Sequence, residues 1–362
     1  MIDLKVIVTA GGTGGHIYPA LAIIKKIKEK EPKSEILYIG THNRMENKIV
    51  PRENIPFKSL KIYGFSTNTP FRNIKNIFYI KNAYKESLEI IKKFKPDIVI
   101  GVGGYVAYPV IKAAHKLGIK TLIHEQNAIP GKANKMLAKY ADAIAVSFKE
   151  TEDSFPKNKV YVTGNPCGEE AIEAPKQKRS RYNLDSKQKL VVIVAGSQGS
   201  LALNSEMKDF LKNVSKEKYQ VLYITGKSFY QDFIKNEKFS PNVKVVPYVD
   251  NLPGLLKNTD LVICRAGAST ISEIIALGIP SILIPSPYVP NNHQYYNALR
   301  LKDIHAGLLL EESELNTKVL KKQINNLLDN KKKYLEIKNN LKKIEVKDSS
   351  ELIYNIVKDM IK

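Results

Sequence analysis

Near its start the chain carries a histidine directly after a run of glycine and threonine. His16 follows residues 11–15, which read G-G-T-G-G, and an apolar run precedes them. Glycine lets backbone N–H groups approach an anion, and the helix expected next adds the positive end of its dipole. Neutral imidazole can take a proton from a hydroxyl group near pH 7. The pattern predicts a substrate-binding loop whose histidine takes part in catalysis or ligand binding. The plainer alternative is a tight turn with a packed side chain.

Two common nucleotide-binding loops fit this stretch poorly. A dinucleotide loop reads G-x-G-x-x-G and is followed, about 20 residues later, by an acidic residue at the end of the second strand. Here that strand ends in Gly40 and Thr41. A P-loop requires G-K-[ST], which is absent from this loop. A nicotinamide-dependent oxidoreductase is therefore disfavoured.

A second loop of small residues lies between an apolar run and a helical pattern at 264–274, C-R-A-G-A-S-T-I-S-E-I. Its N–H groups and hydroxyls suit a phosphate. Glu273 can accept two hydrogen bonds from a ribose diol, although a carboxylate here could also simply stabilise the start of the helix. His293, Gln294 and Asn297 follow in a polar loop, and amide side chains of this kind can bond sugar hydroxyls.

Buried strands and amphipathic helices alternate along most of the chain, which predicts an α/β fold of doubly wound parallel sheets. The strand pattern restarts near residue 189 after a polar, basic linker. We therefore expect two Rossmann-like domains, 1–164 and 165–345, and a C-terminal helix in 346–362 that could pack back on the first domain. Two such domains imply a cleft between them, where ligands usually bind.

Composition restricts the class of protein. The 362 residues are 43% apolar and 26% charged, as in a soluble globular protein, and no apolar run reaches the length of a membrane span. The start lacks signal-peptide features, which predicts a cytosolic protein. Cys167 and Cys264 make no metal or disulfide framework. The net charge of +21 suits anionic partners or reflects a lysine-rich genome; no nucleic-acid motif accompanies it, so we expect no nucleic acid.

Seven motifs in order over nearly the whole chain resemble the MurG family of peptidoglycan N-acetylglucosaminyltransferases. They are GGTGGHIYPALAI, GVGGYVAYP, HEQNAIPGKANK, TGNP, AGSQGSLALN, CRAGASTISEI and NNHQYYNA. The resemblance implies the GT-B glycosyltransferase fold. It also implies inverting transfer of GlcNAc from UDP-GlcNAc to undecaprenyl-diphospho-muramoyl-pentapeptide (lipid I), which gives lipid II. No cofactor is expected. Because the sequence has no Asp-x-Asp motif placed to bind a divalent cation, we also expect no bound metal.

The resemblance also implies roles for individual residues. His16 is the expected base for the acceptor hydroxyl, with Glu125 as its competitor. The sugar and the acceptor diphosphate are assigned to Thr13, Gly14, Gly15 and Asn127. The donor diphosphate is assigned to Ser197, Gln198, Gly267, Ala268, Ser269, Thr270, Ile271 and Ser272. Val249 is expected beside uracil, Glu273 on the ribose, and His293 and Gln294 on the GlcNAc hydroxyls.

The chain departs from the family pattern at two positions. Gly168 stands where the family usually has an arginine after G-N-P, so a donor-side cation is missing or comes from Arg179, Arg181 or Lys132. Arg44 replaces a family glycine after the second strand, which could reshape that loop.

A lipid-linked acceptor requires contact with the cytoplasmic face of the membrane. Apolar residues alternate with cations in one stretch: Phe71, Arg72, Ile74, Lys75, Ile77, Phe78, Ile80 and Lys81. Such a pattern suits an anionic membrane surface, but also an ordinary helix with its apolar face in the core. The rival functions are a UDP-GlcNAc epimerase, a diacylglycerol glycosyltransferase and a non-catalytic nucleotide-sugar-binding protein.

Overall fold

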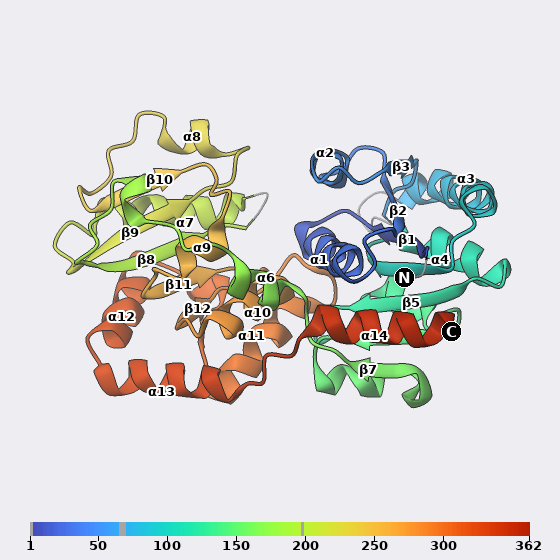
Figure 1. Cartoon of the computed structure of the whole chain (residues 1–362). Helices are drawn as coiled ribbons and strands as arrows, with labels where there is room; N and C mark the ends of the chain where they lie inside the picture. The colour runs from blue at the N-terminus through green and yellow to red at the C-terminus, as the bar shows by residue number, and fades with distance from the viewer. Residues whose placement is uncertain (1–2, 65–69, 197–198) are drawn as a thin grey trace. The chain divides into compact units, whose positions relative to one another are not determined.

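The computed structural model describes residues 3–64, 70–196 and 199–362, and among these the side chains of all but 70–74. The chain divides into two compact units (Figure 1). Unit 1 comprises Met1–Cys167 and Lys347–Lys362, and unit 2 comprises Gly168–Val346. The sequence placed the first boundary at Gly164, three residues before this division.

Unit 1 contains a seven-stranded parallel sheet in the order β3-β2-β1-β4-β5-β6-β7. The strands are β1 (Lys5–Ala10), β2 (Glu35–Thr41), β3 (Phe57–Leu60), β4 (Ile98–Gly103), β5 (Lys120–Glu125), β6 (Ala143–Val146) and β7 (Val160–Val162). Its helices are α1 (Gly14–Lys30), α2 (Glu46–Arg52), α3 (Pro70–Phe94), α4 (Ala107–Lys116), α5 (Lys132–Leu137) and α14 (Ser349–Ile361), with short 3-10 turns η1 (Lys149–Ser154) and η2 (Lys157–Lys159).

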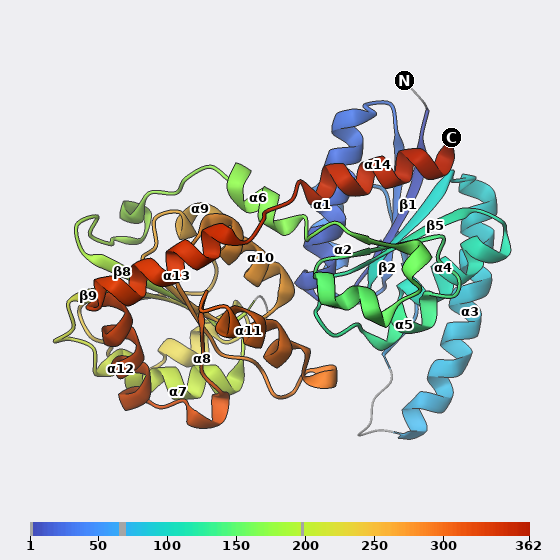
Figure 2. The same ribbon diagram turned by 90° about the horizontal axis from the view of Figure 1, so that it is seen from below.

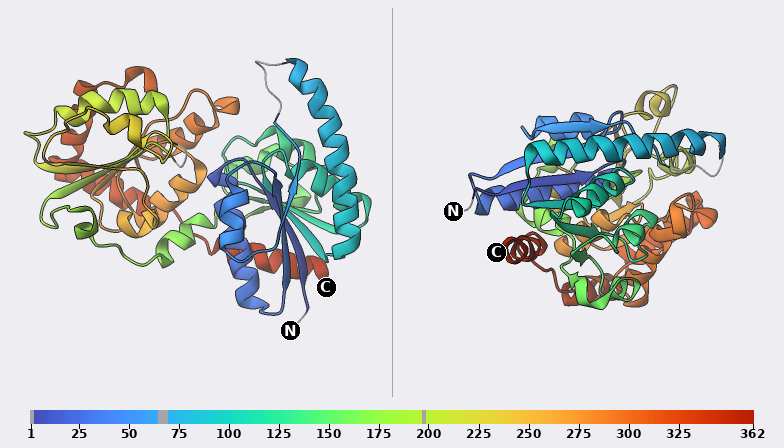
Figure 3. Two further views of the ribbon diagram at one scale, coloured as in Figure 1. Left: turned by 90° about the horizontal axis from the view of Figure 1, so that it is seen from above. Right: turned by 90° about the vertical axis from the view of Figure 1, so that its right-hand side faces the viewer.

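Both faces of this sheet are covered, so β1 is buried along nearly its whole length. Val6 and Val8 pack in a core with α1 and α14, whereas Ile7 packs in a second core with α3 and α4. Figure 3 shows α1 on one side of the strands and α3 on the other. The alternation of side chains across a strand explains why these strands look continuously apolar in sequence.

Unit 2 has a six-stranded parallel sheet in the order β10-β9-β8-β11-β12-β13. The strands are β8 (Lys189–Val194), β9 (Tyr219–Ile224), β10 (Val243–Val246), β11 (Leu261–Cys264), β12 (Ser281–Leu283) and β13 (Leu308–Leu309). The helices are α6 (Cys167–Glu173), α7 (Leu201–Lys212), α8 (Tyr230–Ile234), α9 (Leu252–Leu256), α10 (Ala268–Leu277), α11 (His293–Asp303), α12 (Thr317–Leu328) and α13 (Lys331–Lys343), with 3-10 turns η3 (Arg179–Tyr182), η4 (Pro290–Asn292) and η5 (Glu312–Glu314).

The predicted α/β class with two parallel sheets is confirmed. In each sheet the strand order reverses beside the first strand of its unit, between β1 and β4 and between β8 and β11. Ligands of open α/β sheets bind at such a switch point, beyond the carboxyl ends of the strands. Both loops singled out in the sequence follow one of these four strands.

The last helix, α14, returns to unit 1 and lies against α1 (Figure 2). Ile353 and Val357 enter the core, and the Tyr354 hydroxyl donates to Glu31 Oε1 at 2.8 Å. Lys30 and Glu351 add an ion pair at 2.8 Å. None of the helices in the described ranges combines the length and apolar character needed to cross a bilayer.

Candidate active site

Two glycine loops interlock at the switch point of unit 1. The Gly11 N–H, just after β1, donates to the Gly103 carbonyl at the end of β4 over 3.3 Å. Gly104 has a φ of +83°, and a Cβ there would lie 2.4 Å from the Gly11 oxygen. Only glycine permits this approach, so the backbones of the two loops contact each other directly at Gly11 and Gly104.

His16 lies in the first turn of α1 with its ring against the second loop. A Cβ on Gly103 would lie 2.5 Å from His16 Cδ2. His16 Nδ1 is 3.1 Å from the Gly11 carbonyl oxygen and 3.3 Å from Thr13 Oγ1. Because a carbonyl oxygen can only accept, this contact assigns the proton of the neutral ring to Nδ1. Nε2 then carries the lone pair, and no hydrogen bond reaches it within the described residues.

The charge state of His16 is set by opposing effects. Burial lowers its pKa, whereas the Gly11 carbonyl, Glu125 and Glu46 raise it, and the net direction is downward. The ring is therefore neutral near pH 7 and can accept a proton at Nε2. The two nearby carboxylates stabilise the imidazolium that proton transfer would create.

Glu125 is buried at the end of β5, and both its oxygens are occupied. Oε1 accepts from the backbone N–H and side-chain amide of Asn127, at 2.9 and 3.1 Å. Oε2 accepts from the Gly131 N–H at 3.0 Å and from Asn134 Nδ2 at 2.9 Å. Four donors hold this carboxylate in place, so it shapes the loop that carries Asn127 and is less suited than His16 to remove a proton.

Two buried residues beside these loops escaped the sequence analysis. His124 donates from Nε2 to the Gly164 carbonyl at 3.0 Å, and its Nδ1 accepts from Gln126 Nε2 at 2.9 Å. Burial lowers the pKa of His124 to about 4, so it is a neutral structural histidine. A histidine inside a strand pattern gives no sequence signal of such a role.

The second missed residue is Glu46, at the start of α2. Its carboxylate is fully buried and accepts from the Gly12 N–H at 3.2 Å and from the Thr41 N–H and hydroxyl at 3.0 and 2.6 Å. Arg44, the departure noted in the sequence, is exposed in the turn just before it. The sequence signal that could have pointed to Glu46 was an acidic residue five positions after the end of a buried strand.

In unit 2, α10 begins at Ala268 with Gly267 as its N-cap. Thr270 lies half-buried on the first turn, and Ser269 beside it. The Ser272 hydroxyl donates to the Ala268 carbonyl at 3.0 Å, and the Ile271 side chain is buried in the core. Only the backbone of Ile271 can therefore belong to a binding site, and the Ser272 hydroxyl already has a partner within the helix.

Glu273 is the next residue of α10 and is half-buried. Burial raises the pKa of its carboxyl to about 8. Within the described part of the chain, no hydrogen bond or ion pair reaches it. A partly protonated carboxyl without a protein partner is suited to bind hydroxyl groups of a ligand.

The remaining donor-side residues lie in loops of the same unit. Gln294 Oε1 accepts from the Ser286 N–H at 2.9 Å, which fixes the loop after β12. His293 is the first residue of α11, and Asn297 Nδ2 donates to the Ala266 carbonyl at 3.2 Å, tying α11 to the loop before α10. Val249 is buried shortly after β10. Ser197 and Gln198 lie outside the described residues.

One suggested replacement for the missing arginine is wrong. Arg179 binds Asp260 at 2.9 Å and the Gln188 carbonyl at 2.6 Å, next to the amino ends of β11 and β8. It therefore lies at the opposite end of the sheet from Glu273. Arg181 is exposed and lies 4.0 Å from Asp250.

Gly168 itself, where the family has arginine, packs against α10. A Cβ there would lie 3.3 Å from the Ser272 carbonyl oxygen. Lys132, the third suggested cation, belongs to unit 1 at the start of α5. A buried cation that the sequence analysis did not single out is Arg265, which pairs with Glu312 and donates to Ser200 Oγ at 2.7 Å.

Helix α3 exposes part of its apolar face. Ile77 and Phe78 are 56% and 65% exposed, between the exposed Lys75 and Lys81. Ile80 instead packs against the core. The side chains of Phe71, Arg72 and Ile74 lie outside those described.

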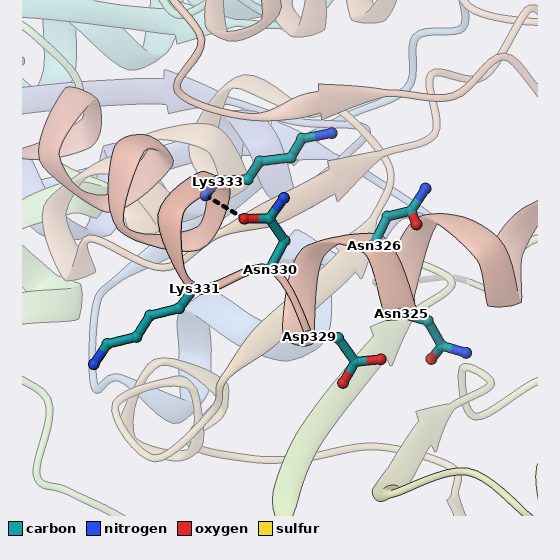
Figure 4. Close-up of a pocket in the computed structure, with 6 residues that line it drawn as sticks. All are labelled: Asn325, Asn326, Asp329, Asn330, Lys331 and Lys333. Atoms are coloured by element: carbon teal, nitrogen blue, oxygen red, sulfur yellow. Dashed lines mark hydrogen bonds between the residues drawn. The ribbon is translucent and has the colours of Figure 1, made fainter.

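A pocket at the corner of α12 and α13 lies on another part of unit 2 (Figure 4). Its lining comes from the end of one helix and the start of the next, where Asn330 caps α13 by accepting from the Lys333 N–H at 3.0 Å. It includes none of the strand-end loops. Among the described residues, no three histidine, cysteine or acidic side chains are grouped as a metal ion would require.

Comparison with known proteins gives full-length matches. Residues 6–146 match the glycosyltransferase family 28 N-terminal domain and residues 190–353 its C-terminal domain. A protein of Bacillus licheniformis, named UDP-N-acetylglucosamine--N-acetylmuramyl-(pentapeptide) pyrophosphoryl-undecaprenol N-acetylglucosamine transferase, is 45% identical over 99% of both chains.

Solved structures agree with this match. The crystal structure of Acinetobacter baumannii MurG is 29% identical, covers 98% of this chain and 99% of its own, and superposes with a TM-score of 0.75. A UDP-GlcNAc 2-epimerase from Neisseria meningitidis shares the fold at 14% identity and a TM-score of 0.68, with 98% and 100% coverage. Since matched domains and relatives span nearly the whole sequence, the chain belongs to glycosyltransferase family 28, as a member of its MurG group.

Proposed function

We propose that this chain is the N-acetylglucosaminyltransferase that moves GlcNAc from UDP-GlcNAc to undecaprenyl-pyrophosphoryl N-acetylmuramyl-pentapeptide, giving lipid II for peptidoglycan synthesis. The observation that carries the proposal is 45% identity over 99% of both chains to a relative with that name. The epimerase shares only the fold at 14% identity, so it does not support epimerase chemistry.

Unit 2 supplies the donor half of this proposal. The first turn of α10 offers backbone N–H groups and the positive end of the helix dipole to the diphosphate. Glu273 accepts hydrogen bonds from the ribose hydroxyls, and Val249 lies beside uracil. Gln294 and His293 face the GlcNAc hydroxyls. Ser197 and Gln198 complete the assignment from the family resemblance.

Unit 1 supplies the acceptor half. His16 Nε2 takes the proton of the acceptor 4-hydroxyl while the oxygen attacks C1 of GlcNAc. The C1–O bond to UDP breaks, and UDP leaves with the electron pair. Because the attack comes from the face opposite to UDP, the configuration of the anomeric carbon inverts. The Gly11 carbonyl, Glu46 and Glu125 stabilise the resulting imidazolium. The N–H groups and dipole of α10 stabilise the charge on departing UDP.

The test of this chemistry compares two variants in a transfer assay with lipid acceptor. His16→Ala should lower kcat by roughly 10²- to 10⁴-fold, the usual contribution of a general base, and leave UDP-GlcNAc affinity unchanged. Glu125→Gln keeps the shape of the side chain and one of its two oxygens, which still accepts from two of the four donors, so its kcat should fall less than that of His16→Ala. Full activity of His16→Ala, or a larger loss in Glu125→Gln, would contradict the assignment of the base.

Product analysis separates the rival functions. With UDP-GlcNAc alone, an epimerase releases a UDP-sugar epimer, whereas this chain should leave the donor unchanged. With diacylglycerol in place of the muramoyl acceptor, we expect no glycolipid. A non-catalytic binding protein would bind UDP-GlcNAc and form no product under any of these conditions.

We infer further that the protein works at the cytoplasmic face of the membrane, which Ile77 and Phe78 contact while Lys75 and Lys81 meet anionic headgroups. Exposed apolar side chains flanked by cations support this inference. Phe78→Glu and Lys75→Glu should reduce flotation with anionic liposomes, whereas Leu335→Glu, at a residue 44% exposed on α13, should not. Unchanged flotation of the α3 variants would reject this surface.

A further inference from the structure

The Gly11–Gly12 peptide group lies between the side chains of Glu46 and His16 and forms hydrogen bonds to both. The Gly11 carbonyl accepts from His16 Nδ1 at 3.1 Å. The N–H of the same peptide, on Gly12, donates to the Glu46 carboxylate, 3.2 Å from Oε2 and 3.4 Å from Oε1. The carbonyl and N–H of a trans peptide point in opposite directions. A carboxylate that attracts the N–H on one side therefore directs the carbonyl toward the histidine on the other.

Glu46 is held firmly enough to impose this orientation. Its Oε1 accepts from the Thr41 N–H at 3.0 Å and from the Thr41 hydroxyl at 2.6 Å, and the side chain has no exposed surface. A Cβ on Gly11 would lie 2.3 Å from Oε1, and one on Gly40 would lie 2.7 Å from Glu46 Cγ. The two glycines thus leave the space that the carboxylate fills.

The peptide itself has little intrinsic preference for this orientation. It joins two glycines, and Gly12 has a φ of +90°. Turning the peptide over would change the sign of this φ, and glycine adopts positive and negative φ about equally well. If the peptide turned over, its N–H would face His16 Nδ1. That nitrogen would then have to carry the lone pair, and the proton of the neutral ring would move to Nε2. A ring in that state cannot take a proton from a hydroxyl at Nε2.

We propose that Glu46 is a positioning residue that fixes the tautomer of His16 through the orientation of the Gly11–Gly12 peptide. The proposal deepens the proposed function, because it rests on His16 Nε2 as the base. It extends the carboxylate–histidine arrangement of other enzymes by placing one peptide group between the two side chains.

Glu46→Gln is the sharpest variant, because it is isosteric. The two donors of Thr41 keep the amide oxygen at the Oε1 position, so the amide NH₂ takes the nearer Oε2 position and meets the Gly12 N–H donor against donor, and only the longer 3.4 Å contact to Oε1 remains. Turning the peptide over relieves this clash, since the Gly11 carbonyl can then accept from the amide. Glu46→Gln should therefore favour the wrong tautomer, and Glu46→Ala should leave a mixture.

The experiment is ¹⁵N NMR of the full chain with labelled histidine, and the spectrum of His16→Gln identifies the His16 signals among the six histidines. We expect Nδ1–H in the wild type and Nε2–H in Glu46→Gln. The kcat of Glu46→Gln should fall about 100-fold, within the range of a misplaced base, with the KM for UDP-GlcNAc within about twofold of wild type. Thr41→Val, which removes a hydroxyl donor and leaves the Gly12 bond, is the matched control and should keep the Nδ1–H form.

Two results would overturn the proposal. One is an Nε2–H ring of His16 in the wild type. This measurement does not depend on the folding of any variant. The other is unchanged His16 signals and kcat in Glu46→Gln with only a lower Tm, which would mean a purely structural role. Full activity of His16→Ala would instead refute the proposed base, and the NMR result would still report whether Glu46 sets the tautomer.

Discussion

At the scale of single residues, the proposed contact of Glu273 with the ribose should make nucleotide binding sensitive to pH. Burial raises the pKa of its carboxyl to about 8 in the protein without ligand. If ribose hydroxyls donate to the ionised carboxylate, as we propose, its pKa should fall on binding and a proton should be released. Affinity for UDP-GlcNAc should therefore be constant above about pH 8 and fall as pH drops below it, by at most about tenfold per unit.

Calorimetry in buffers of different ionisation heat measures both the affinity and the released proton. UDP-GlcNAc is the appropriate ligand because its diphosphate is doubly esterified and does not titrate near pH 7. Glu273→Gln is neutral at every pH, so it should bind more weakly but with no pH dependence between 6 and 9. A wild-type affinity that is flat over the same range would show that Glu273 does not meet the ribose.

The sequence predicted residues whose role depends on local pattern. His16 and Glu273 stand next to loops of small residues after buried strands, and the structure places both at the carboxyl ends of their sheets. Glu46 was missed because its role depends on contact with Gly12, 34 positions away, which only the adjacent strands β1 and β2 create. The error over Arg179 has the same origin, since its partner Asp260 lies 81 positions away.

At the scale of elements, a buried polar contact holds α14 against the C-terminal end of α1. The Tyr354 hydroxyl donates to Glu31, and the two residues are 5% and 7% exposed. Tyr354→Phe removes this donor from a buried carboxylate while it keeps the ring in place. We expect it to lower the free energy of unfolding by about 1–2 kcal/mol, measured by urea denaturation.

Leu352→Ala is the matched control for this prediction, because Leu352 lies on the same helix and is 38% exposed. It should change the free energy of unfolding by less than about 0.5 kcal/mol. Equal effects of the two substitutions would mean that the hydroxyl contributes nothing specific.

Elements themselves were easier to predict than their partners. Continuous apolar runs identified the central strands, because sheets covered on both faces bury every side chain of a strand. The amphipathic pattern of the last helix predicted its existence and allowed packing on the first domain, but it did not single out α1, since an apolar stripe does not specify which surface it packs against. For the same reason the pattern at 70–81 left membrane contact and core packing open, and the structure shows Ile80 on the core side and Phe78 exposed.

At the scale of the whole molecule, the net charge of +21 should make membrane association depend on salt. Lysine and arginine near an anionic surface each contribute about 1 kcal/mol, and this attraction declines within a Debye length, about 10 Å at 0.1 M and about 3 Å at 1 M ionic strength. The proposed apolar insertion of Ile77 and Phe78 should not be weakened by salt in this way.

Flotation with anionic vesicles should therefore fall steeply as salt rises, toward a residual level set by the apolar contact. Phe78→Ala should remove most of that residual binding, whereas Lys75→Ala and Lys81→Ala should lower binding mainly at low salt. Vesicles of neutral lipid provide the control, since they should show only the salt-independent part. Binding that is equally strong on neutral vesicles and at high salt would mean that charge contributes little, and that the lysine content has no part in bringing this transferase to its lipid acceptor.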